Sequence, residues 1–138
     1  GLNLSLAHTD SMAVALVSEF DIGIDLETIG PNARDILPEF ATPDEIAMLE
    51  TSCGIGSGDS DWPTRLWCAK EAVAKLVGTG LGGRPSDFEA LDLTDDGQLL
   101  VHHHPTGSRF VVSTVRLDDS IIAYTTSESA VAEPAAPM

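Results

Sequence analysis

Residues 62 to 77, WPTRLWCAKEAVAKLV, predict one long amphipathic helix, and this segment constrains the fold more than any other. Apolar side chains recur along it at helical spacing, so we expect one face of the helix to enter the core. Asp61 can cap the helix at its start, and Gly78 and Gly80 mark its end. The residues expected to face the core are Trp62, Leu66, Ala69, Val73 and Leu76.

Strand-like runs precede and follow this helix. The order of three strands, three helices and then three or four strands predicts an α+β fold, with a mostly antiparallel sheet packed against the long helix. We expect one domain over residues 1–126 and a disordered tail over 127–138. The other expected elements are strands at 2–6, 12–18 and about 22–27, a short helix or turn at about 32–39, a helix at 42–51 capped by Thr42, and strands in FEALDL, QLLVHHH, RFVVSTVRL and SIIAYTT.

The charge of the chain restricts its partners. Twenty-two acidic residues oppose seven basic ones, a net charge of −15, so nucleic acid is not an expected partner. An anionic ligand would need a metal ion or a local cluster of the few cations. No apolar run approaches the roughly 18–20 residues of a membrane span, so we expect no membrane partner. Cys53 and Cys68 form no disulfide framework and suit a cytoplasmic compartment.

The run IGIDLE contains a first candidate site. A strand here directs Gly23, Asp25 and Glu27 to one face and its apolar residues to the other, which should enter the core. Two carboxylates on one face repel each other, and a hard cation such as Mg²⁺ would relieve that repulsion. The alternative is a strand end with solvated acids, which the pattern alone favours in so acidic a chain.

The long helix offers a second candidate site. Trp67, Glu71 and Lys75 are spaced four residues apart and therefore lie along one face. The alternative is an ordinary surface Glu–Lys pair worth a few tenths of a kcal/mol. The tryptophan on this face, and the presence of both Lys70 and Lys75 on the helix, argue for a site. The sequence therefore favours neither of these two interpretations of the helix over the other.

The histidines give weaker signals. His8, by itself, is more typical of a structural or solvated histidine, and HHH at 102–104 is more typical of a solvated or edge strand.

Together these motifs resemble the 4′-phosphopantetheinyl transferase superfamily. LSLAH, GIDLE, FATPDE and RLWCAKEAVAKLVGTGL follow one another in the order of that family's own pattern. In the family, G-[IV]-D-x-E is followed by F-[ST]-x-x-E and then by W-x-x-K-E-[AS]-x-x-K. The resemblance covers residues 4 to about 90, and the pairing of GIDLE with WCAKEAVAK is its most specific part.

The resemblance implies a reaction and a set of site residues. Coenzyme A would donate its phosphopantetheine arm to a serine of an acyl or peptidyl carrier protein, with Mg²⁺ bound, and 3′,5′-adenosine bisphosphate would leave. Such a metal would let an acidic protein hold an anionic substrate. The implied roles are metal ligation by Asp25 and Glu27, a third carboxylate serving as ligand, base or both at Glu71, phosphate contacts by Lys75 and His8, a less defined cofactor role for Lys70, and orientation of the helix by Trp67.

The resemblance also implies that more than this chain is needed. Surfactin-type members have two similar halves, whereas holo-acyl-carrier-protein synthases build their sites between subunits of a homotrimer. We expect this chain either to be a domain of a larger protein, such as a polyketide or fatty acid synthase, that self-associates, or to need an upstream half-domain. The alternatives are a non-catalytic docking or structural module of a synthase and a small acidic metal-binding domain.

Overall fold

The computed structural model describes residues 1–30, 35–53, 61–80 and 84–132. Over these residues three strands are followed by three α-helices and then by the remaining strands, as expected. The elements are β1 (Asn3–His8), β2 (Ala13–Ser18), β3 (Ile22–Thr28), α1 (Leu37–Phe40), α2 (Pro43–Cys53), α3 (Trp62–Val77), η2 (Pro85–Asp87), β4 (Phe88–Leu93), β5 (Gln98–His103), β6 (Ser108–Leu117), β7 (Ser120–Thr126), η3 (Ser127–Ser129) and β8 (Ala130–Ala132).

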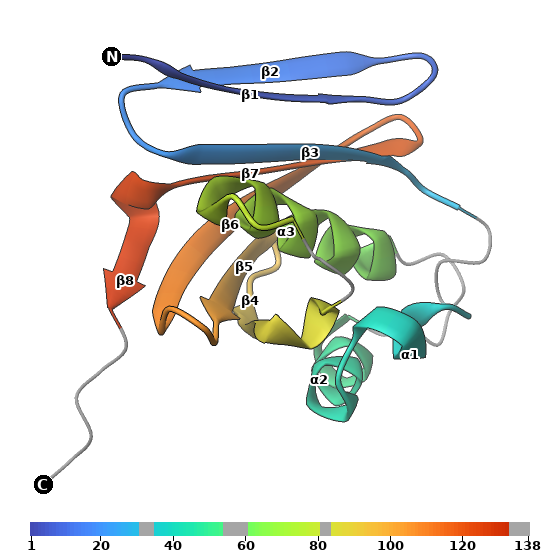
Figure 1. Ribbon diagram of the computed structural model, residues 1–138. Helices are drawn as coiled ribbons and strands as arrows, with labels where there is room; N and C mark the ends of the chain where they lie inside the picture. Colours follow the sequence, from blue (N-terminus) through green and yellow to red (C-terminus); the bar gives the residue numbers. More distant parts are fainter. Residues whose placement is uncertain (31–34, 54–60, 81–83, 133–138) are drawn as a thin grey trace, which may run out of the picture.

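The main sheet is antiparallel and carries α3 against one face (Figure 1). Its strands follow the order β3-β7-β6-β5-β4, and β8 pairs with β6. This arrangement confirms the predicted α+β class. The core lies between α3 and the sheet; its members include the buried Leu66, Ala69 and Val73 of α3 and Phe88, Val101, Val112 and Ile121 of the strands. No helix in the described part of the chain has the length and apolar character of a membrane span.

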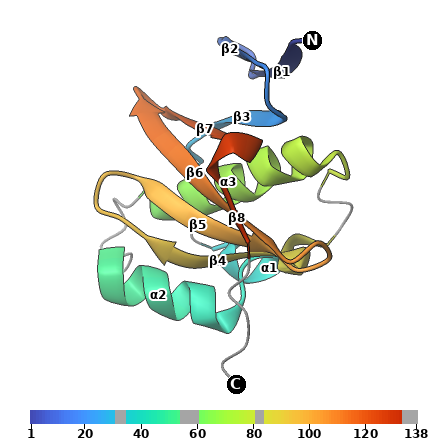
Figure 2. The same cartoon turned by 90° about the vertical axis from the view of Figure 1, so that its left-hand side faces the viewer.

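The β1–β2 hairpin forms a second, two-stranded sheet beside β3 (Figure 2). Side chains join β1 to β3 where no backbone ladder does. The Ser5 hydroxyl accepts a hydrogen bond from the Ile24 amide at 3.1 Å. The Lys75 ammonium donates to the carbonyls of Leu6, at 3.2 Å, and of Ile24, at 2.9 Å. The hairpin is therefore attached to β3 partly through a residue of α3.

Strand β3 is buried on both faces. A Cβ atom placed on Gly23 would lie 1.8 Å from the Ala72 carbonyl oxygen, so this face of the strand lies directly against α3. Asp25 and Glu27 follow Gly23 on the same face because side chains alternate along a strand. The sequence predicted that the opposite face, with Ile22, Ile24 and Leu26, enters the core. These three side chains are indeed buried, and the β1–β2 hairpin packs against β3.

Two of the three expected helix-capping signals act as the sequence predicts, at the start of α2 and at the end of α3. At the start of α2 the Thr42 hydroxyl accepts from the Glu45 amide, and the Glu45 carboxylate accepts from the Thr42 amide, which is a capping box. Helix α3 ends at Gly78, which has a left-handed φ of 79°. Asp61 makes no capping bond, because its two carboxylate oxygens accept hydrogen bonds from Arg65.

The segment expected as a short helix or turn at about 32–39 has a turn at 35–36 and α1 after it, and its residues 32–34 lie outside the described part of the chain. Two further expectations differ from the structure. The first part of the expected tail at 127–138 is folded, because η3 and β8 cover residues 127–132 and β8 forms a backbone ladder with β6. The histidines were expected on a solvated or edge strand, but β5 lies between β4 and β6, and His102 and His103 are buried.

Candidate active site

The predicted faces of α3 and β3 meet. The Trp67 indole nitrogen donates to the Glu27 carboxylate at 3.2 Å, and the Lys75 ammonium lies 3.2 Å from Asp25 Oδ1. Lys75 thus pairs with a strand residue and not with Glu71, its neighbour one turn away on the helix. The spacing that suggested a surface Glu–Lys pair instead directs three side chains of α3 toward the acidic face of β3.

Three carboxylates share this junction, and each affects the others. Burial and the neighbouring Asp25 carboxylate raise the pKa of Glu27 to about 8. Burial and the same charge also raise the pKa of Glu71, against the nearby charge of Lys75, which lowers it. Asp25 is itself buried, and its Oδ2 atom has no hydrogen-bond partner in the structure. The junction therefore holds three carboxyl groups beside one ammonium group, and two of the three carboxyl groups resist ionisation.

These features fit a divalent cation at the carboxylates. Mg²⁺ prefers oxygen ligands, and Asp25 Oδ2 is a buried oxygen without a partner. A cation would also relieve the repulsion that raises the pKa of Glu27 and Glu71. In the described residues, no group of three or more His, Cys, Asp or Glu side chains is already gathered as a metal cage. Metal ligation by Asp25, Glu27 and Glu71 therefore stays a prediction that the electrostatics support.

Lys75 is held by three acceptors. Besides Asp25, its ammonium contacts the carbonyl oxygens of Leu6 and Ile24, and about a third of its side chain is exposed. The carbonyls orient the ammonium at the junction of α3, β1 and β3. A contact between Lys75 and a phosphate, which the resemblance implies, stays a prediction; the exposed part of the side chain is compatible with it.

His8 lies at the end of β1 and is exposed. It follows by two residues the Leu6 carbonyl that Lys75 contacts, so β1 brings it to the same edge of β3. Next to it, the Thr9 hydroxyl oxygen is buried and has no hydrogen-bond partner in the structure. The contact between His8 and a coenzyme A phosphate remains a prediction, at a position open to a ligand.

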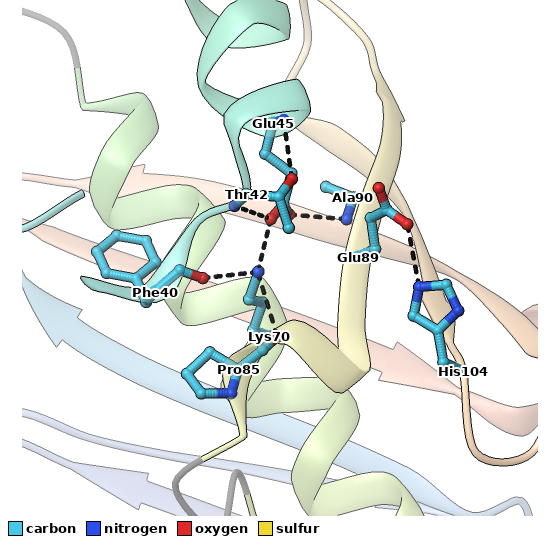
Figure 3. Close-up of polar contacts among 8 residues, drawn as sticks. All are labelled: Phe40, Thr42, Glu45, Lys70, Pro85, Glu89, Ala90 and His104. Carbon is cyan, nitrogen blue, oxygen red and sulfur yellow. Dashed lines mark hydrogen bonds and ion pairs between the residues drawn. The ribbon is translucent and has the colours of Figure 1, made fainter. Parts of the chain in front are cut away.

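Lys70 is not at an accessible position, as a contact with the cofactor would require. Its side chain is fully buried, and its ammonium donates to Glu45 at 2.8 Å and to the carbonyl of Phe40 at 2.8 Å (Figure 3). A third, longer bond of 3.3 Å goes to the carbonyl of Pro85. Burial lowers the pKa of Lys70, against the Glu45 carboxylate, which raises it. Successive helical residues are about 100° apart, so Lys70 points to a different side of α3 from Glu71. Its side chain has no exposed surface, so its ammonium is closed to a ligand.

Sequence reasoning did not single out Glu45. This residue is fully buried, and its second oxygen accepts a hydrogen bond from the Ala90 amide at 2.9 Å. The spacing of Thr42 and Glu45 in TPDE is a capping-box signal and could have drawn attention to it. The bond between Glu45 and Lys70 had no such signal, because it joins residues 25 positions apart.

Comparison with known proteins decides the family. The family model described as the 4′-phosphopantetheinyl transferase superfamily matches residues 21–125. The chain belongs to this superfamily. The matched region includes the junction of β3 with α3 and the network around Lys70.

Curated relatives carry corresponding names. The 4′-phosphopantetheinyl transferase psf-1 of Bacillus pumilus is 31% identical over 132 residues, which are 95% of this chain and 55% of the relative. A 4′-phosphopantetheinyl transferase of Bacillus subtilis is 30% identical over 100 residues, or 72% of this chain and 43% of the relative. The chain thus spans about half the length of these two transferases.

A solved structure has the same fold in a shorter chain. The holo-[acyl-carrier-protein] synthase of Helicobacter pylori, in complex with coenzyme A, superposes with a TM-score of 0.57 at 18% identity. The match covers 76% of this chain and 97% of the synthase chain. Nearly the whole of that protein therefore corresponds to the unit described here.

Proposed function

We propose that this domain transfers the 4′-phosphopantetheine arm of coenzyme A to a serine of an acyl or peptidyl carrier protein, with Mg²⁺ bound. The observation that carries the proposal is the meeting of Asp25, Glu27 and Glu71 beside Lys75, with one buried carboxylate oxygen that has no hydrogen-bond partner among the described residues. Family membership supports it, since these residues stand in the matched region.

The reaction is a phosphoryl transfer. The serine oxygen forms a bond to the phosphorus that carries pantetheine, the bond from that phosphorus to the bridging oxygen breaks, and 3′,5′-adenosine bisphosphate leaves with the electron pair. Bound Mg²⁺ would supply charge neutralisation at the pyrophosphate. We propose that Glu71 takes the serine proton, because it presents a carboxylate at the junction where the phosphate would bind. Lys75 would stabilise the charge on the phosphate oxygens.

We expect a second unit to complete the coenzyme A site, either an upstream half-domain or other copies in a homotrimer. Coenzyme A carries several phosphate charges, and the chain holds only seven basic residues. Lys70 is buried in its network, and Arg65 is bonded to Asp61 and Thr114. The side chains of Lys70 and Arg65 are therefore bonded within the domain. We expect the remaining contacts to phosphate to come from another unit.

Intact-mass spectrometry of an apo carrier protein tests the proposal. The carrier should gain one phosphopantetheine group when incubated with this domain, coenzyme A and Mg²⁺, and the gain should be lost with EDTA. Asp25→Asn serves as the matched inactive variant. If neither the domain nor the longer chain with its upstream region transferred the group, while both still bound coenzyme A, the non-catalytic module would be the better account.

A further inference from the structure

The buried pair of Lys70 and Glu45 joins four segments of the chain (Figure 3). Glu45 belongs to α2 and Lys70 to α3. The Lys70 ammonium also contacts the Phe40 carbonyl at the end of α1 and the Pro85 carbonyl at the start of η2. Both charged side chains are fully buried, so the pair is screened from water and has a fixed set of partners.

Phe40 connects this network to the carboxylates. Its carbonyl is bound by Lys70, and its ring contacts Trp67 edge-on, with centroids 5.1 Å apart and planes at 66°. Trp67 in turn donates its indole N–H to Glu27. A continuous path of contacts thus runs from the buried pair, through the ring of Phe40 and the indole, to a carboxylate of the candidate active site.

We propose that Lys70 and Glu45 are positioning residues that fix Phe40 against Trp67 and so hold the indole that orients Glu27. A buried ion pair is weak evidence for stability, because the cost of removing both charges from water offsets much of their attraction. Its role is better explained by geometry, since both partners are fixed by backbone groups: Glu45 by the Thr42 and Ala90 amides, and Lys70 by two carbonyls. The catalytic part of this inference rests on the proposed transfer, whereas the geometric part does not.

The test follows the indole N–H of Trp67 by ¹⁵N NMR, in a Trp62→Phe parent that leaves one tryptophan. The double variant Lys70→Met with Glu45→Gln removes both charges at similar side-chain length. We expect its indole signal to shift and its proton to exchange with solvent at least about tenfold faster, the scale of one lost hydrogen bond to a charged group. Transfer should show kcat lowered about tenfold, with KM for coenzyme A changed less than about twofold.

Two further variants keep the test decisive. Phe40→Leu leaves the carbonyl that Lys70 binds and removes the ring, so it should produce the same indole shift if the double variant does not fold. Val112→Ala removes core volume in β6, away from the path, and should lower stability while leaving the indole signal and kcat in place. An unchanged indole signal in the folded double variant or in Phe40→Leu, or an equal shift in Val112→Ala, overturns the inference. The NMR result needs no activity, so it separates this inference from the proposed function.

Discussion

Gly23 of β3 lies directly against the backbone of α3 at Ala72. A Cβ atom at Gly23 would fall 1.8 Å from the Ala72 carbonyl oxygen and 2.9 Å from the Leu76 amide nitrogen. Real Cβ atoms do not approach backbone so closely, so the strand and the helix can pack at this distance only because position 23 has no side chain. This close approach brings Asp25 and Glu27 within reach of Lys75 and Trp67.

Gly23→Ala should therefore separate β3 from α3. We expect a loss of about 1–3 kcal/mol or more in the free energy of unfolding, since backbone cannot yield as a flexible side chain does. Transfer activity should fall further than stability, because the carboxylates move away from the helix. Urea unfolding and carrier mass gain measure the two effects. Gly30→Ala is the control, since nothing lies within 4 Å of a Cβ there, and equal behaviour of the two variants would contradict the argument.

Removing the charge of any one junction carboxylate should stop metal-dependent transfer. Asp25→Asn, Glu27→Gln and Glu71→Gln each keep the shape of the side chain, so we expect folded proteins whose kcat/KM falls at least about 100-fold. Glu19→Gln, at an exposed position, should keep full activity. Wild-type rates in all three junction variants would show that the site assignment is wrong.

Metal-free protein should lose stability as the pH rises through about 8. Glu27 has its pKa raised from 4.5 to about 8 in the folded protein, so between these values the folded state binds a proton that the unfolded chain has released. Stability therefore declines as pH increases across this range, and the decline is complete above the folded pKa. Urea midpoints from pH 5 to 9 measure it. Glu27→Gln should flatten the decline, and equal slopes in both proteins would contradict the assignment.

Loss of the Lys75 ammonium should loosen the β1–β2 hairpin. Lys75→Met removes the donor that joins the carbonyls of Leu6 and Ile24, and it leaves Asp25 without its ion pair. We expect faster amide hydrogen exchange in peptides from β1 and β2, read by mass spectrometry, together with a lower transfer rate. Peptides from β4 and β5 provide the internal control, and unchanged exchange in the hairpin would show that Lys75 does not hold it.

Several expectations followed correctly from local chemistry. The bounds of α3 were predicted from its apolar period and from the glycine at its end, since a left-handed residue stops a helix whatever surrounds it. The strands after α3 were predicted from alternation and turn residues. Asp61 was misjudged because a capping side chain has competing partners, and Arg65 one turn later takes both of its oxygens.

Local sequence patterns predicted the order of elements, the antiparallel α+β class and the charged residues that lie on one face of α3 or β3. Those properties depend on neighbours within a few positions, where periodicity and capping act. Tertiary structure alone decided the rest: that Lys75 pairs with Asp25, that both faces of β3 are buried, and that Lys70 is enclosed with Glu45. Such contacts join residues 25 to 50 positions apart, and packing of whole elements sets them.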